Sequence, residues 1–215
     1  MNAKAYWIIG IVLTALTLGV SVGLFPILPE RLPTHWNIKG EVDAYGDRTW
    51  SAFLLPICMA GTLGFFLVLP YLSPRSFSVD TFRETSLLIM LIILVMFAYI
   101  HGLTLYSGLR GQVDVARALV AGIFLGLAAM GNVLGKVRRN FYIGIKTPWT
   151  LASERVWNDT HRLGAWTFAV GGLLGFALAL MGWLILATVV IVPAALIPVV
   201  YSFLHYKALE RRGEV

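Results

Sequence analysis

Charge is scarce in this chain. Only 13% of its 215 residues are Asp, Glu, Lys or Arg, whereas an ordinary soluble domain carries about a quarter. The stretches 87–100 and 118–133 contain no charged residue at all. A helix of a soluble protein needs polar and charged residues along one face. The shortage of charge therefore excludes an ordinary soluble fold.

Cysteine and recognisable catalytic motifs are also scarce. Cys58 is the single cysteine, which excludes an intrachain disulfide. The sequence contains no nucleophile motif, zinc-protease helix or nucleotide-binding loop. We therefore predict no catalytic residue, no cofactor and no enzymatic activity. His35, Asp43 and His101 stand at unrelated spacings, so no metal site is predicted from them.

Long hydrophobic runs dominate the sequence. A helix that spans a bilayer needs about 20 mostly apolar residues, and six runs are long enough. The first is too long for a signal peptide and is followed by no convincing cleavage site, so we predict an uncleaved span. Gly182 separates the last two runs by a tight turn. The prediction is an all-α integral membrane protein with about six transmembrane helices, over residues 5–25, 51–72, 85–106, 115–135, 164–181 and 183–204.

The distribution of Lys and Arg predicts the orientation of these spans. With a cytoplasmic N-terminus, the N-terminal segment, the inner loops and the tail together hold twelve basic residues, and the outer loops hold five. Short cytoplasmic loops carry the excess of Lys and Arg in membrane proteins. We therefore predict a multi-pass protein of the cell membrane with both termini in the cytoplasm. A basic cytoplasmic face also explains the net charge of +6, so direct nucleic-acid binding is not predicted.

The spans and loops suggest four units along the chain. Residues 1–75 form two helices with an outer loop, 76–114 a third helix with its connections, 115–205 three helices with a cytoplasmic segment, and 206–215 a basic tail. Glycine pairs at 122/126, 131/135 and 171/175 predict close helix packing. Pro193 and Pro198 are predicted to bend the last span and to free carbonyls near Val189 and Ala194, for which a packing kink is favoured over an ion site.

The outer loop from Pro33 to Tyr45 is one of two informative polar segments. His35 and Asp43 are suited to binding a cation or a peptide group, and Trp36 and Tyr45 to the interface between water and lipid. An ordinary loop anchored by its aromatic residues explains the same composition equally well. His101 lies late in the third span, so it is predicted near the outer surface and within reach of this loop.

The inner segment from Lys136 to Leu163 is the other. Its basic run, residues 136–139, is explained by the orientation of the protein. Thr147 and Pro148 have the residue types of a helix cap and first helical position. The pattern from there to Leu163 predicts an amphipathic helix in the plane of the membrane, with an ion pair between Arg155 and Asp159. Orientation alone does not require Asn140, Gly144 or the Thr147–Pro148 pair.

These two segments resemble a known pair of sequence motifs. The inner one reads Gly-Asn-x-Leu-Gly-Lys-x-Arg-Arg-Asn-Phe-x-Ile-Gly-Ile-Lys-Thr-Pro-Trp-Thr-Leu over residues 131–151, then Val-Trp-x-x-Thr-His-Arg-x-Gly over 156–164. This closely resembles the SdpI family of bacterial multi-pass membrane proteins. The outer Pro-x-His-Trp-Asn-x-x-Gly-x-x-Asp-x-Tyr, residues 33–45, is similar to the uncharacterised domain that commonly precedes it. Lys146 stands where the family usually has arginine, which keeps the charge and loses the bidentate fork.

The resemblance implies immunity against a secreted antimicrobial peptide toxin. It also implies that toxin sensing at the membrane holds a transcriptional repressor there. The outer loop would then face the toxin through His35, Trp36, Asn37, Gly40, Asp43 and Tyr45, together with His101. The inner segment would couple to the repressor, or bind lipid, through Arg138, Arg139, Asn140, Gly144, Lys146, Thr147, Pro148, Trp157, Thr160, His161 and Arg162.

Two other function classes remain open at this point. A transporter of a small molecule, an ion or a peptide would have to act as a homo-oligomer at this length, and it would lack the buried charged groups that ion coupling usually needs. A lipid-binding scaffold is suggested by the basic, aromatic inner segment. Flux into liposomes tests the first class, and binding to anionic lipid tests the second.

Overall fold

A computed structural model describes residues 2–37, 39–110 and 115–215. The described residues contain six helices long and apolar enough to cross a membrane, which confirms the predicted all-α membrane fold. The predicted domain boundary at residue 114 lies outside the described residues. The six helices are α1 (Ala3–Leu24), α2 (Arg48–Leu72), α3 (Arg83–Arg110), α4 (Ala116–Leu134), α6 (Glu154–Leu180) and α7 (Leu184–Arg212).

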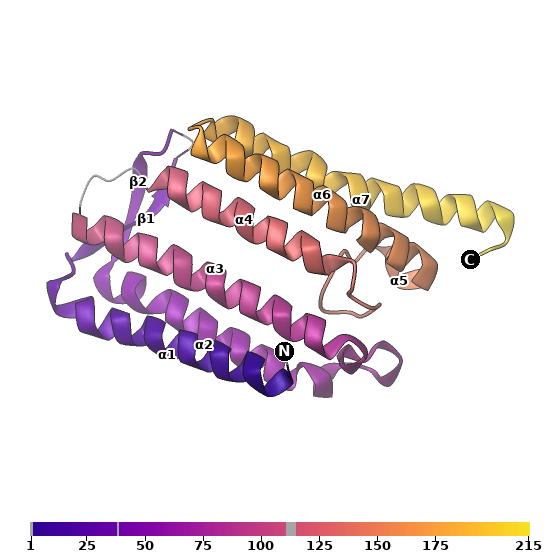
Figure 1. The fold of residues 1–215 in the computed structure, drawn as a ribbon, viewed down its shortest axis with the longest axis horizontal. Helices are drawn as coiled ribbons and strands as arrows, with labels where there is room; N and C mark the ends of the chain where they lie inside the picture. Colours follow the sequence, from indigo (N-terminus) through magenta and orange to yellow (C-terminus); the bar gives the residue numbers. More distant parts are fainter. Residues whose placement is uncertain (1, 38, 111–114) are drawn as a thin grey trace.

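Small elements lie at the two ends of the helix bundle (Figure 1). One end carries a two-stranded antiparallel hairpin of β1 (Arg31–Trp36) and β2 (Val42–Asp47), beside the 3-10 turn η1 (Phe25–Ile27). The opposite end carries the short helix α5 (Pro148–Ala152), the turns η2 (Arg75–Phe77) and η3 (Val79–Phe82), and both chain ends. The predicted outer and inner segments therefore lie at opposite ends of the molecule.

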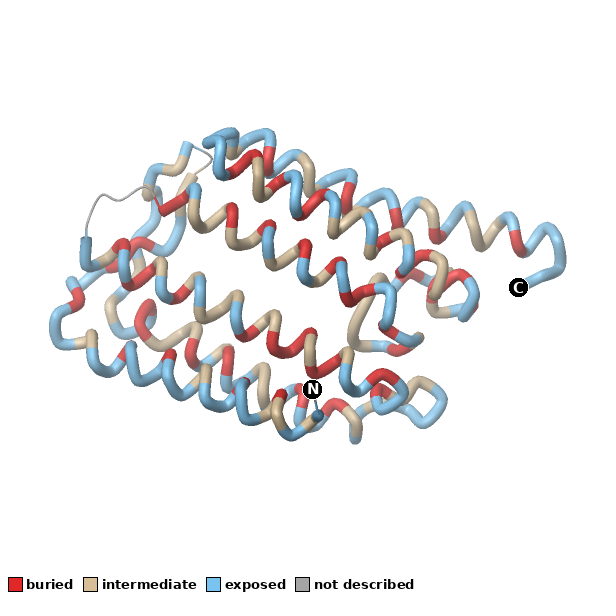
Figure 2. Tube along the Cα trace, viewed as in Figure 1, coloured by how far each residue is buried: buried red, intermediate tan, exposed pale blue. Residues whose placement is uncertain are grey.

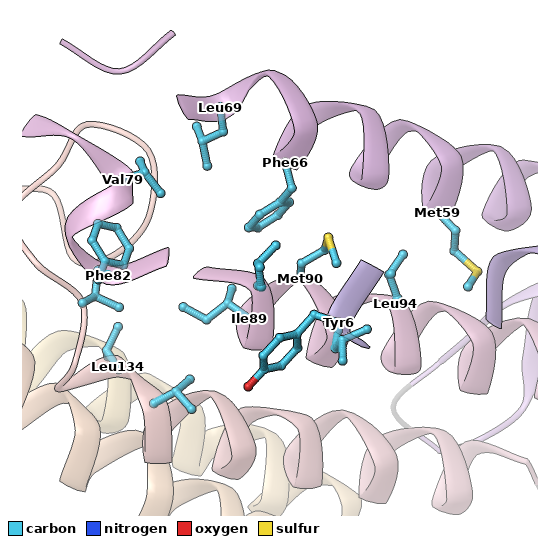
Figure 3. Close-up of a cluster of buried hydrophobic side chains, with 14 of the residues drawn as sticks. Tyr6, Met59, Phe66, Leu69, Val79, Phe82, Ile89, Met90, Leu94 and Leu134 are labelled. Atoms are coloured by element: carbon cyan, nitrogen blue, oxygen red, sulfur yellow. The ribbon is translucent and has the colours of Figure 1, made fainter. Parts of the chain in front are cut away.

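The spans pack as two groups of three. Helix α3 packs against α1 and α2, α6 packs between α4 and α7, and α3 also contacts α4. The larger apolar core joins the two groups at the end near α5, because it includes Tyr6, Phe66 and Met90 as well as Leu134 and Trp157 (Figure 3). Figure 2 shows buried positions along the inward faces and exposed positions along the outer faces of α1 and α7. Exposed apolar faces of this kind suit contact with lipid chains.

Glycines allow α4 and α6 to approach closely. A Cβ at Gly131 would lie 2.5 Å from the backbone nitrogen of Ala169, and one at Gly172 would lie 2.5 Å from that of Ala128. Real Cβ atoms do not come so close to backbone, so these two positions require glycine. The pair Gly122 and Gly126 instead accommodates the side chains of Tyr99 and Met96 from α3. Small residues thus form the contacts between neighbouring spans, as expected for helices packing in lipid.

The prolines of α7 leave a carbonyl that a neighbouring helix satisfies. Pro198 has no N–H to donate to the carbonyl of Ala194, four residues earlier. The Thr167 hydroxyl of α6 donates to that carbonyl oxygen at 2.8 Å. This side chain satisfies the carbonyl that Pro198 leaves free and joins α6 to α7, which favours a packing role over an ion site at this position.

The inner amphipathic segment differs from its prediction in two respects. We expected one helix up to Leu163, separate from the span beginning at Gly164. The structure has the five-residue α5, an extended Ser153, and then α6, which runs without a break from Glu154 to Leu180. The predicted pair of Arg155 with Asp159 is also wrong, because Arg155 bonds Glu214 at 2.7 Å and Asp159 bonds His205 at 3.0 Å. Tertiary partners from the end of the chain displaced the local pair.

Candidate functional site: an outer hairpin and an inner polar lock

A tight turn shapes the outer hairpin. The Asn37 side-chain oxygen accepts the backbone N–H groups of Lys39 and Glu41 at 2.9 and 3.0 Å. Gly40 has φ +87°, a left-handed backbone that favours glycine. Strand pairing aligns His35 with Ala44 and Trp36 with Val42, with register irregularities on both sides of His35. Irregularities of this kind re-aim side chains, which places His35 and Asp43 together.

His35 and Asp43 form an exposed pair on this hairpin. Their Nδ1 and Oδ1 atoms are 2.5 Å apart, and the side chains remain 67% and 43% exposed. The bond fixes the imidazole ring while leaving both groups accessible. Tyr45 is also exposed, whereas Trp36 is half-buried with its indole N–H unpartnered among the described residues. The hairpin thus displays a carboxylate, an imidazole and a phenol at the end of the bundle.

The hairpin is held firmly on the helices below it. Leu32 is fully buried with Leu28, Ala52 and Leu105, and it packs so closely on Gly108 that a Cβ there would lie 3.0 Å from its Cγ. Asp47 caps α2 by accepting the Thr49 N–H at 2.8 Å. The hairpin that carries the site residues is therefore anchored on α2 and α3.

A polar hollow of about 500 Å³ lies at the base of the hairpin. Acidic, basic and hydroxyl groups all face it, so it offers complementary contacts to the polar groups of a peptide. It is lined by Glu30, Arg31, Tyr45, Asp47, Arg48 and Thr49.

His101 takes a different place from the one we expected. Its ring is 1% exposed, and its Nε2 lies 2.7 Å from the Ser21 hydroxyl of α1. The described residues offer no partner for its Nδ1. His101 therefore belongs to the contact between α1 and α3 and is not among the side chains that the hairpin displays.

In the inner segment, Asn140 organises the loop after α4. Its side-chain amide donates to the carbonyls of Arg138 and Ile143 at 2.8 and 2.9 Å, and its oxygen accepts the N–H groups of Tyr142 and Ile143. The side chain is completely buried. Each of these four bonds satisfies a backbone group that helices and strands do not reach. Asn140 therefore acts as a buried template, which means that its hydrogen bonds hold the backbone of the loop in one conformation.

The His161 ring lies in close contact with Trp157 and Gly144. The His161 Nε2 accepts the Ile145 N–H at 2.9 Å, so the ring is neutral there and its Nδ1–H donates to the Trp157 carbonyl at 2.8 Å. The two rings stack at 4.0 Å between centroids, and the indole donates to the Val137 carbonyl at 2.7 Å. Gly144 has φ +119°, and a Cβ there would lie within 2.3 Å of the His161 Nε2. We refer to Asn140, Gly144, Trp157 and His161 as the inner lock.

The predicted helix start at Thr147 is confirmed, and Thr147 makes more hydrogen bonds than the sequence indicated. Thr147 caps α5, with Pro148 at its first position, and Thr150 completes a reciprocal capping box. The Thr147 hydroxyl also lies 3.0 Å from that of Ser202 in α7. Sequence reasoning missed Thr150, although its position three residues after Thr147 is the spacing of a capping box. It also missed Tyr142, whose hydroxyl donates to the Leu72 carbonyl at the end of α2 at 2.7 Å.

The predicted inner residues thus include buried, half-buried and exposed ones. Thr160 is buried beside the inner lock with its hydroxyl unpartnered in the described part of the chain. Arg139 is half-buried, because it lies over the Phe77 ring and donates to the Leu151 carbonyl at 3.2 Å. The residues that remain exposed to a partner are Arg138, Lys146, Pro148 and Arg162.

Two segments of the chain match known protein families. Residues 136–202 match the SdpI/YfhL protein family, and residues 12–60 match a domain of unknown function, DUF1648. The first match begins at the inner segment and continues into α7, and the second contains the outer hairpin. Residues 136–202 are thus similar to this family, which confirms the resemblance seen in their motifs. The six long apolar helices make the chain a multi-pass membrane protein.

One relative is similar over almost the whole chain. It is the immunity protein SdpI of Bacillus subtilis (strain 168), with 29% identity over 209 residues, covering 94% of this chain and 96% of the relative. No solved structure matches this chain. Because it covers 94% of this chain, the similarity extends over most of both matched segments.

Proposed function

We propose that this protein confers immunity against a secreted peptide toxin, without enzymatic activity, from a cell membrane in which both termini are cytoplasmic. The observation that carries the proposal is the similarity over 94% of the chain to an immunity protein. In this arrangement the hairpin faces outward and meets the toxin. The inner lock holds the cytoplasmic ends of the spans together.

The chemistry of the hairpin supports this assignment. The carboxylates of Glu30, Glu41, Asp43 and Asp47 are exposed around the hairpin and its polar hollow. Together they attract basic groups of a peptide, and the His35 imidazole and the Tyr45 hydroxyl add hydrogen-bonding groups. Because Leu32 anchors the hairpin, little ordering of this surface is needed on binding.

A second part of the proposal concerns the cytoplasmic face. Exposed Arg138, Lys146 and Arg162 form the surface available to a transcriptional repressor held at the membrane. The buried members of the inner lock make no direct contact with the repressor. Their role is to position the exposed residues.

The proposal predicts that the chain protects sensitive bacterial cells. Cells that express it should survive a dose of the peptide toxin produced by a strain carrying the immunity relative, whereas cells with an empty vector die. The measurement is survival against toxin dose, with a fluorescent C-terminal tag to verify equal expression in the membrane. Unchanged killing at good expression would contradict the proposal, and toxin-dependent flux into liposomes would favour a transporter instead.

A further inference from the structure

A small polar pocket lies where the ends of the spans meet near α5. Its volume is about 250 Å³, below the ~300–1,000 Å³ of sites for drug-sized ligands. The turns η2 and η3 form one wall, and the loop after α4 with the start of α6 forms the other. It is lined by Ser76, Phe77, Ser78, Thr81, Arg138, Arg139 and Glu154.

The pocket contains a pre-positioned guanidinium group. The Arg139 guanidinium lies 5.0 Å from the centre of the Phe77 ring and donates to the Leu151 carbonyl at 3.2 Å. Phe77 in turn packs against Phe141, with 4.4 Å between ring centroids. These contacts fix the side chain and leave further N–H donors of its fork available. Less conformational entropy is lost when a fixed group binds a ligand.

Arg138 supplies a second cation whose side chain has no internal partner. It is exposed and makes no hydrogen bond or ion pair within the described part of the chain, while its backbone carbonyl is held by Asn140. The Ser78 hydroxyl oxygen accepts the Asp80 N–H at 3.2 Å, so its own proton is available to a ligand. Glu154 is the single carboxylate in the lining. Adjacent guanidinium groups with hydroxyl donors are the chemistry that recognises a phosphate group.

The position of the pocket indicates where the phosphate comes from. α2 ends at Leu72, α3 begins at Arg83, α4 ends at Leu134 and α6 begins at Glu154, so the pocket lies at the level where spans leave the hydrocarbon core. Lipid headgroups lie at that level. The excess of Lys and Arg assigns this face to the cytoplasm, and basic pockets between spans on that side bind anionic headgroups.

We propose that Arg138 and Arg139, with the hydroxyls of Ser76 and Ser78, form a binding site for a phosphate group, supplied by the headgroup of an anionic phospholipid. The ligand bridges the η2–η3 turns and the loop after α4. It therefore connects the α1–α3 group to the α4–α7 group at the same end as the inner lock. The site is separate from the outer hairpin, so its test is independent of toxin immunity.

The test is lipid binding to the purified full-length protein in a neutral, phosphate-free detergent, followed by native mass spectrometry with phosphatidylglycerol. The wild-type protein should retain one phosphatidylglycerol at low lipid concentration. Arg138→Gln should weaken this binding about fivefold, the effect of one basic residue near an anionic surface. Glu154→Gln should strengthen it, because the change removes the carboxylate that repels a phosphate. Thermal unfolding verifies that each variant is folded.

Lys136→Gln is the matched control, because Lys136 is an exposed base on the same loop that does not line the pocket. It should leave the first lipid bound as in the wild type. Equal losses for Lys136→Gln and Arg138→Gln would overturn the site in favour of diffuse surface charge, and so would unchanged binding in Arg138→Gln. Inorganic phosphate is added as a competitor. Displacement of the lipid supports the site with free phosphate as its ligand, and failure to displace it supports the headgroup.

Discussion

We expect Gly144→Ala to lower the stability of the protein more than any other substitution that adds one methyl group to the inner segment. The new Cβ would lie within 2.3 Å of the His161 Nε2 and 3.2 Å from the Trp157 ring. The backbone at φ +119° is also strained for any residue with a side chain. Overpacking and backbone strain each cost about 1–3 kcal/mol, so the free energy of unfolding should fall by roughly 2–5 kcal/mol. Thermal unfolding in detergent, followed by tryptophan fluorescence, measures the change.

Gly102→Ala is the matched control for this substitution. Gly102 lies within α3, and a Cβ there meets nothing within 4 Å. Alanine is favoured over glycine in a helix by about 0.5–1 kcal/mol, so this variant should be as stable as the wild type or slightly more stable. If Gly144→Ala unfolds at the same temperature as Gly102→Ala, the close contact of Gly144 with His161 is not present in the protein.

Asn140→Ala should have a comparable effect for a different reason. It removes four hydrogen bonds from a completely buried side chain and leaves two carbonyls and two N–H groups of the loop without partners. Each buried polar group left unsatisfied costs about 1–3 kcal/mol. Partial relaxation of the loop toward water makes a total loss of roughly 3–5 kcal/mol the expected result. The measurement is the free energy of unfolding in a mild denaturing detergent.

The exposed Asn132 of α4 provides the comparison for Asn140. Asn132→Ala should leave stability within about 0.5 kcal/mol of the wild type. A stable Asn140→Ala protein that had lost contact with a cytoplasmic partner would mean that Asn140 contacts the partner directly. That result would contradict its role as a buried template.

Local patterns account for the parts of the fold that the sequence predicted well. Six spans followed from hydrophobic length alone, because each span must satisfy its own backbone in lipid. The cap at Thr147 followed from residues adjacent in sequence. The outer hairpin was missed because its strands contain Pro33 and lack a regular alternation. They are stabilised by each other and by the burial of Leu32 against α3, contacts that no local window contains.

The inner motif could be located from the sequence, but not interpreted. Its residue types suggested a surface for a partner or for lipid. The structure buries Asn140, Trp157 and His161, whose side chains bond to backbone groups up to 20 residues away, and it packs Gly144 against His161. His101 differs for the same reason, since its partner Ser21 is 80 residues distant. Side-chain type predicted polarity at these positions, and only the packing of the helices determined which groups became buried.

The central claim is that the exposed pair on the hairpin faces the toxin. The most direct measurement is survival of toxin-treated cells that express His35→Ala together with Asp43→Ala. The control is Arg155→Ala together with Glu214→Ala, which removes an ion pair of similar exposure, 57% and 41%, at the opposite end of the bundle. With equal expression, the hairpin variant should be killed like cells without the protein, and the control should survive like the wild type. Full protection by the hairpin variant would contradict the claim.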